Sequence, residues 1–114
     1  LCSTLTTTIS DELRYADTIK VADDGKITFF SKNFGGTGSE GISFSLNEDG
    51  QILLGNRLIL SKRAYPYRLR AAMDLKYEQQ TRIFSVNLKI RRGSQTAALA
   101  EDTFEVKAIN AQSN

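Results

Sequence analysis

The chain contains no histidine and only one cysteine, and these two shortages exclude most catalytic and metal-binding chemistry. Because it has no partner thiol, Cys2 cannot form a disulfide within the chain. Without histidine, zinc, haem and iron–sulfur sites have too few ligands, and the Ser–His and Cys–His nucleophile pairs cannot form. We therefore predict a protein that is not an enzyme, with no catalytic residue, no metal and no cofactor.

The sequence also lacks an apolar run of 18 residues, and it has a single proline, Pro66. A chain of 114 residues is long enough to bury about two thirds of its unfolded surface in one core. We therefore expect residues 1–114 to form a single globular domain.

Apolar residues recur at intervals of three and four near the N-terminus, at Leu5, Ile9, Leu13 and Ala16. This spacing places them on one face of a helix, which we predict over residues 1–21. Four of the first eight residues are threonine, a poor helix former because its branched Cβ loses rotamer freedom. The helix should therefore depend on packing against the rest of the domain.

Short apolar or alternating segments on either side of glycine turns indicate β-hairpins after the helix. Asp23-Asp24-Gly25 separates residues 18–22 from 26–31, and Glu48-Asp49-Gly50 follows the alternating segment 42–46. Gly55-Asn56 predicts a tight two-residue hairpin. Neither acidic turn has the twelve-residue oxygen pattern of a calcium loop, so both are interpreted as ordinary turns.

Residues 33–41 form a predicted loop with four glycines. The segment Gly35-Gly36-Thr37-Gly38 resembles a phosphate-binding loop only in its glycine content, because no Lys-Ser or Lys-Thr pair follows it. We assign the loop no ligand.

The strongest strand pattern lies between Arg68 and Arg91, where apolar residues alternate with polar ones. A turn at Gln79-Gln80 would pair two strands and bring apolar residues together on one face. The predicted pairs are Leu75 with Phe84, Met73 with Val86, Ala71 with Leu88 and Leu69 with Ile90. A last strand is predicted over residues 103–109.

These patterns predict an α+β fold in which an N-terminal amphipathic helix packs on an antiparallel β-meander sheet. Residues 1–21 would form the helix, 22–110 a β-rich region and 111–114 a frayed tail. Burying the helix stripe would stabilise the domain by about 1.5 to 3 kcal/mol per large apolar side chain. The predicted helix-to-sheet contact comprises Leu5, Ile9, Leu13 and Ala16 on the helix and Met73, Leu75, Phe84, Val86 and Leu88 on the sheet.

Charge is unevenly distributed although the net charge is only +2. Between Arg57 and Arg92 there are ten lysines and arginines against two acidic residues. Either this region lies beside acidic strands that neutralise it, or it forms a docking surface for an acidic protein or for nucleic acid. The candidate basic surface consists of Arg68, Arg70, Lys89, Arg91 and Arg92, with Tyr65 and Tyr67 as the nearby aromatic residues.

The order of these elements resembles that of a type IV pilin or pseudopilin of the Gram-positive type. The matching segments are residues 5–19 with Asp11-Glu12-Leu13-Arg14-Tyr15-Ala16, the hairpin 24–29, the segment 48–55 and the closing Phe104-Glu105-Val106. Pilins of Gram-negative bacteria often close a C-terminal loop with a disulfide, which Cys2 alone cannot form. This departure fits the Gram-positive type.

The resemblance implies a minor pilin or pseudopilin that acts by assembly into a filament. In the family, an apolar half-helix would precede Leu1 and anchor the full-length subunit in the cytoplasmic membrane before assembly. The assembled protein would then lie at the cell surface. The implied partners are other pilin subunits, with no small-molecule substrate.

Two other functions remain open from the sequence. A DNA-binding competence pilin would use the basic surface to contact phosphates. An extracellular cadherin-like β-sandwich adhesion module would match Asp49-Gly50-Gln51-Ile52 and residues 67–75, but it would give residues 1–16 no strand to form. We expect helix content to separate these alternatives, with about 15 to 20 helical residues in a pilin and almost none in a sandwich.

Overall fold

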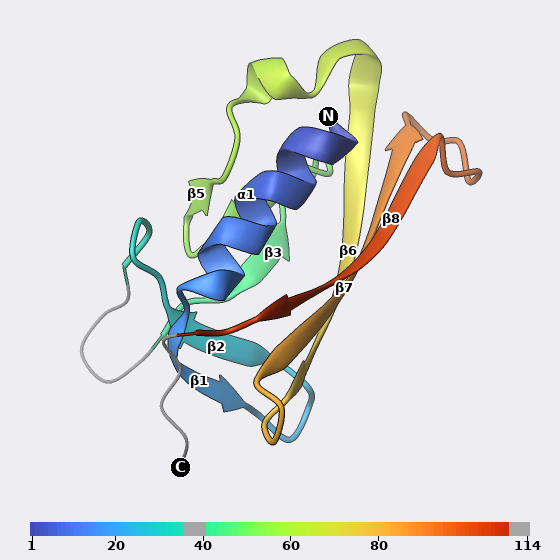
Figure 1. Ribbon diagram of the computed structural model, residues 1–114. Coiled ribbons are helices and arrows are strands. Elements are labelled where there is room, and N and C mark those ends of the chain that lie inside the picture. Colours follow the sequence, from blue (N-terminus) through green and yellow to red (C-terminus); the bar gives the residue numbers. More distant parts are fainter. Residues whose placement is uncertain (36–40, 110–114) are drawn as a thin grey trace.

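A computed structural model describes residues 1–35 and 41–109 of the chain, which fold into one helix and three small antiparallel sheets (Figure 1). The sheets contain strands β1-β2, β3-β4-β5 and β6-β7-β8, in that order. The elements are α1 (Cys2–Arg14), β1 (Asp17–Val21), β2 (Ile27–Phe30), β3 (Phe44–Leu46), β4 (Ile52–Leu54), β5 (Arg57–Leu58), two 3₁₀ turns η1 (Lys62–Ala64) and η2 (Pro66–Arg68), β6 (Leu69–Glu78), β7 (Ile83–Arg92) and β8 (Ala100–Lys107).

The predicted α+β architecture is wrong, because the structure is mostly β with one short helix. The strands do not form one meander sheet across the domain. Within the described residues, β3 belongs to a sheet with β4 and β5, whereas β6 pairs only with β7. Strand patterns along the chain identified most of the strands and the hairpin pairs β1-β2, β4-β5 and β6-β7, but they did not indicate that the strands divide into three separate sheets.

The helix is also shorter than predicted, because α1 ends at Arg14 and residues 17–21 form a strand. Lys20 lies opposite Thr28 and Val21 opposite Ile27, on either side of the Asp23-Asp24-Gly25 turn. The β-branched residues of this segment favour a strand, and the glycine, at φ +90°, allows the chain to turn back. The chain therefore forms the β1-β2 hairpin instead of continuing the helix to residue 21.

The apolar face of α1 is completely buried against the strands. Leu5, Ile9, Leu13 and Ala16 have no exposed surface, and α1 packs mainly on β8 and β7. Of the predicted sheet partners, Phe84, Val86 and Leu88 are buried, whereas Met73 and Leu75 on β6 are only partly buried. The core is completed by residues from the other sheets, among them Phe29, whose ring lies 6.3 Å from that of Phe84.

The predicted register of β6 and β7 is shifted by two residues. In the structure Leu75 lies opposite Val86, Met73 opposite Leu88 and Tyr77 opposite Phe84. The connection spans four residues, 79–82, rather than the two predicted at Gln79-Gln80. Because the shift is even, each side chain keeps the predicted face of the sheet.

Other local predictions agree with the structure more closely. Gly55 and Asn56 connect β4 to β5, with Leu54 opposite Arg57. The last strand begins earlier than predicted, at Ala100. The glycine-rich loop at 36–40 and the predicted tail at 111–114 lie outside the described residues.

A buried carboxylate ties α1 to the end of β2. Glu12 is only 5% exposed, and its two carboxylate oxygens accept hydrogen bonds from the Ser31 hydroxyl and from the Asn33 side-chain amide (2.7 Å). The Ser31 oxygen also accepts the Phe34 N–H at 3.0 Å. The helix is therefore fixed to the sheet by polar contacts as well as by its apolar face.

We predict that Leu13→Asp unfolds the domain, because the substitution places an unpaired charge in the core. Thr7→Asp is the matched control, since Thr7 is exposed on the same helix. Circular dichroism during heating should show no cooperative transition for Leu13→Asp and a normal one for Thr7→Asp. A normal transition for Leu13→Asp would contradict the proposed core.

Glu12→Ala should lower the free energy of unfolding by about 2–3 kcal/mol, because it removes the acceptor of two side-chain donors. Asp11→Ala is the control: Asp11 is exposed and lies 3.8 Å from Arg14, a contact that contributes little. Urea denaturation of both variants measures the difference. Equal midpoints would show that the buried carboxylate does not stabilise the fold.

Candidate functional site

The predicted basic residues gather where β6 begins and β7 ends. We call Arg68, Arg70, Lys89, Arg91 and Arg92 the basic end. Arg70 lies directly opposite Arg91, and the Gly93 N–H donates to the Arg68 carbonyl at 2.9 Å. The antiparallel pairing of two strands thus brings together residues that are 19 to 24 positions apart in the sequence.

The basic end covers more than one face of the sheet. Arg70, Lys89 and Arg91 alternate with the buried residues of β6 and β7, so they lie on the face away from α1. Arg92 has the same parity as the buried Ile90 and therefore projects on the opposite side. On the face away from α1, Arg70 pairs with Arg91 and Ala72 with Lys89, whereas the predicted register would have placed Arg70 opposite Lys89.

Arg70 is held in place by the second acidic turn. Its guanidinium donates to the Glu48 carbonyl at 2.7 Å, and the Ala71 N–H donates to the Gly50 carbonyl at 2.7 Å. Gly50 has φ +72°, and a Cβ there would lie 2.6 Å from the Cβ of Arg70. Glycine at this position is therefore required both by the turn and by the close approach of β6.

The charges of the basic end are poorly neutralised within the domain. The ion pair found in the described residues joins Arg14 to Asp11, away from this region. Glu101 lies opposite Lys89 across β7 and β8, and it accepts a hydrogen bond from the Asn87 amide at 2.8 Å. Asp74 and Glu101 line a hollow with Lys89 and Arg91, and Asp49 lines another with Arg68 and Arg70. In the described residues none of these three carboxylates forms an ion pair with the basic end, which leaves an excess of positive charge that favours an anionic surface.

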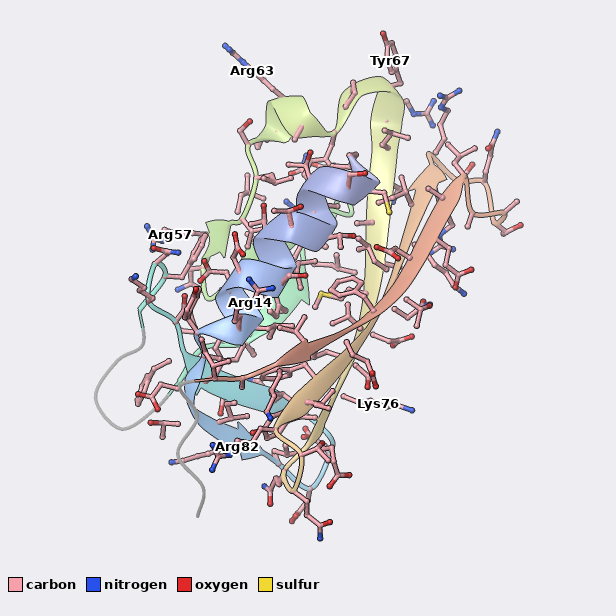
Figure 2. All side chains as sticks on the ribbon, viewed as in Figure 1. Arg14, Arg57, Arg63, Tyr67, Lys76 and Arg82 are labelled. Atoms are coloured by element: carbon pink, nitrogen blue, oxygen red, sulfur yellow. The ribbon has the colours of Figure 1, made fainter. Side chains whose placement is uncertain are left out.

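The two tyrosines at the basic end differ sharply in exposure. Tyr67 is 79% exposed and projects from the end of the molecule (Figure 2), whereas Tyr65 is only 6% exposed. The Tyr65 hydroxyl accepts the Ile52 N–H at 3.0 Å. Burial raises the pKa of the Tyr65 hydroxyl, and this hydrogen bond partly offsets the rise. Of the two aromatic residues, only Tyr67 is available to a partner.

The backbone that presents Tyr67 is strained. Tyr67 and Arg68 both have left-handed conformations, with φ +58° and +62°. Two consecutive side chains in this region are costly, since a residue with a Cβ avoids it. This strain directs Tyr67 outward immediately before β6, and nothing in the local sequence indicates it.

An open hollow lies beside these residues. Its volume is about 600 Å³, and it is lined by polar and charged groups together with part of Tyr65. The other lining residues are Asp49, Gln51, Arg68, Leu69, Arg70, Gly93 and Ser94. Such a hollow suits a polar protein loop better than an apolar ligand.

The remaining sequence candidates serve structural roles in the described residues. Gly25 and Gly50 complete turns, and the Asp24 carboxylate accepts the Lys26 N–H at 2.9 Å. Cys2 is a half-buried free thiol. Within residues 1–35 and 41–109 there is no group of three or more potential metal-ligating side chains.

Comparison of the chain with protein-family models, curated proteins and solved structures gave no match. In the described residues, no helix has both the length and the apolar character needed to span a membrane.

We predict that Tyr67→Gly raises the free energy of unfolding by about 1 kcal/mol, because glycine adopts a positive φ without strain. Tyr67→Ala is the control, since it removes the same ring but keeps the strained Cβ. Thermal denaturation should show a higher melting temperature for the glycine variant than for the alanine variant. Equal melting temperatures would mean that Tyr67 is not strained.

Proposed function

We propose that the protein is a structural subunit, a minor pilin or pseudopilin, of a type IV pilus-like filament or of a related secretion or DNA-uptake system. It acts by assembly with neighbouring subunits rather than by catalysis. The observation that carries the proposal is the basic end, whose five cations form no ion pair in the described residues and which begins at Arg68, next to the exposed Tyr67. The resemblance of the ordered sequence segments to pilins supplies the specific kind of assembly.

The composition of the basic end supports a protein partner. Tyrosine and arginine are the residues most enriched at the energetic centres of protein interfaces. The positive charge would steer an acidic face of the neighbouring subunit and fix its orientation. A patch at one end of an elongated domain, 43 Å in its longest dimension, also suits head-to-tail contacts, which generate filaments when the rotation does not close.

The proposal does not rest on a single meander sheet, which the structure lacks. It requires an N-terminal helix with a buried apolar face, and α1 has 13 residues with three fully buried apolar side chains, Leu5, Ile9 and Leu13. This length lies closer to the 15 to 20 residues expected of a pilin than to the near absence expected of a β-sandwich. The helix therefore counts against the cadherin-like alternative.

The full-length subunit would be anchored in the cytoplasmic membrane by an apolar half-helix before Leu1, and the assembled filament would lie at the cell surface. Both statements follow from the resemblance to pilins. The described residues form the part that would remain outside the membrane.

DNA binding is a second candidate, favoured specifically by Tyr67. An exposed aromatic ring beside Arg68 and Arg70 is able to stack on a base while the arginines contact phosphates. The single exposed ring and the nearby Glu101 make this less favourable than a protein partner. Binding of a 20-base-pair duplex that weakens steeply between 50 and 200 mM salt would support DNA.

We predict that Arg68→Glu combined with Arg91→Glu lowers the amount of protein in the filament fraction sheared from cells by about tenfold or more. The reversed charges would repel the acidic face of the neighbouring subunit. The measurement compares the sheared fraction with the total cellular protein, both quantified by immunoblotting in the cells that produce the full-length chain.

The matched control is Lys76→Glu combined with Arg82→Glu, which changes the net charge equally at the other end of β6 and β7 (Figure 2). This control should assemble normally. Absence of the unmodified protein from the sheared fraction would refute the filament proposal. Equal loss for both double variants would show that total charge, rather than the basic end, controls assembly.

A further inference from the structure

A second surface lies away from the basic end, where the free edges of β3 and β6 face each other. Next to the two ends of β3, the Asn47 N–H donates to the Gln51 carbonyl and the Gly55 N–H to the Ser43 carbonyl. Because successive residues of a strand direct their backbone groups to opposite sides, Phe44 and Leu46 direct theirs away from β4. On this side Ile42, just before β3, exchanges backbone hydrogen bonds with Phe29 of β2, whereas Phe44 and Leu46 have no paired strand there in the described residues.

The same argument identifies the free edge of β6. The Arg68 carbonyl accepts the Gly93 N–H, so the even-numbered residues of β6 bond to β7 and the odd-numbered residues face outward. The Ala71 N–H, which faces outward, donates to the Gly50 carbonyl. Met73 and Leu75, further along, have no strand partner on this side within the part of the chain that the structure describes.

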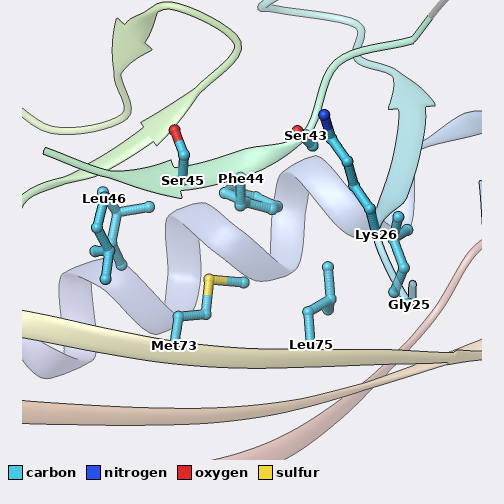
Figure 3. Close-up of a pocket in the computed structure, with 10 residues that line it drawn as sticks. Gly25, Lys26, Ser43, Phe44, Ser45, Leu46, Met73 and Leu75 are labelled. Carbon is cyan, nitrogen blue, oxygen red and sulfur yellow. The ribbon is translucent and has the colours of Figure 1, made fainter. Parts of the chain in front are cut away.

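A groove with a volume of about 210 Å³ lies between these two edges. Phe44 and Leu46 point toward it from β3, and Met73 and Leu75 from β6, with α1 behind them (Figure 3). Lys26 stands at one end of the rim. The groove therefore combines an apolar lining, a cation at one end and backbone hydrogen-bonding groups along both sides.

We propose that this groove binds an extended strand of another protein, with apolar side chains at alternate positions and an acidic residue near Lys26. An apolar lining alone suits many ligands, but free backbone N–H and C=O groups on both sides select a strand. Main-chain hydrogen bonds would supply affinity, and the pockets for alternate side chains would supply specificity. This site is separate from the basic end and does not depend on the filament function.

A synthetic peptide provides the test. In acetyl-Glu-Val-Thr-Val-Thr-Val-Thr-amide, valines alternate with threonines and glutamate supplies the acidic end. Adding it should slow amide hydrogen exchange at Met73 and Leu75, or at Phe44 and Leu46, by about tenfold or more, as expected for amides that enter hydrogen bonds. Unchanged exchange at these four amides with millimolar peptide would overturn the proposal.

An N-methylated version of the peptide is the matched control, because it keeps the side chains but lacks the backbone donors. It should bind at least about tenfold more weakly, as measured by fluorescence anisotropy. Equal binding of the two peptides would show that apolar contact, not strand pairing, holds the peptide, and this result would overturn the proposal.

Two substitutions at one position test the edge from the protein side. Leu75→Pro removes an N–H that faces the free edge, where proline is tolerated, whereas Leu75→Ala keeps this N–H. The peptide should bind the proline variant at least about tenfold more weakly than the alanine variant. Equal binding of the peptide to the two variants would contradict the inferred strand pairing. If the proline variant unfolds at a lower temperature than the alanine variant, the amide exchange of the unmodified chain is the deciding test of the proposal.

Two other occupants give distinct results. A dimer detected by sedimentation and abolished by Leu75→Pro would assign the groove to a second copy of the chain. Binding of an apolar fluorescent dye that the peptide does not displace would assign it to a small amphiphile. Either result would overturn the proposed partner strand.

Discussion

The whole domain depends on burial of the apolar face of α1. In residues 1–35 and 41–109 no sheet has more than three strands, and a two-stranded hairpin such as β1-β2 is only marginally stable in water by itself. Leu5, Ile9, Leu13 and Ala16 provide the surface around which strands from different sheets pack. Each of the larger side chains contributes about 1.5 to 3 kcal/mol by leaving water. The sheets are thus joined through a shared core rather than through continuous backbone pairing.

The helix depends equally on the sheets. A 13-residue segment rich in threonine is too short to be stably helical in water. Glu12 adds a polar connection to Ser31 and Asn33, and the Thr6 hydroxyl donates to the Asp102 carboxylate at 2.9 Å. These contacts fix the position of the helix along β2 and β8, which apolar packing alone would leave less well defined.

The sequence allowed prediction of features that follow from local periodicity. The spacing from Leu5 to Ala16 identified the buried helix face, and alternation in residues 69–77 identified the inward face of β6. The register failed because two consecutive glutamines do not specify a turn length, and the observed connection uses Arg82 at φ +60°. The prediction of a single meander sheet was wrong because the periodicity of a segment does not indicate which distant strand it pairs with.

In the candidate site, too, the features that depend on residue type and sequence position were predicted, and those that depend on contacts between distant segments were not. The basic residues were identified from their types and positions, and antiparallel pairing brings them together. The exposure of Tyr67, the burial of Tyr65 and the buried role of Glu12 depend on contacts between distant segments. A left-handed tyrosine has no distinctive sequence signal, since glycine or asparagine is the usual residue in that conformation.

The free edge of β6 carries backbone N–H and C=O groups that have no strand partner in the described residues. Long edge strands are normally protected by charges, bulges or covering segments, because their unpaired backbone groups attract other strands. The start of β6 is protected by the Glu48-Asp49-Gly50 turn, through Ala71 and Arg70. Further along, Met73 and Leu75 alternate with Asp74 and Lys76, but those charged residues lie on the opposite face. An edge that is protected at one end and left apolar at its centre is better explained by a use for that edge than by the stability of the isolated domain.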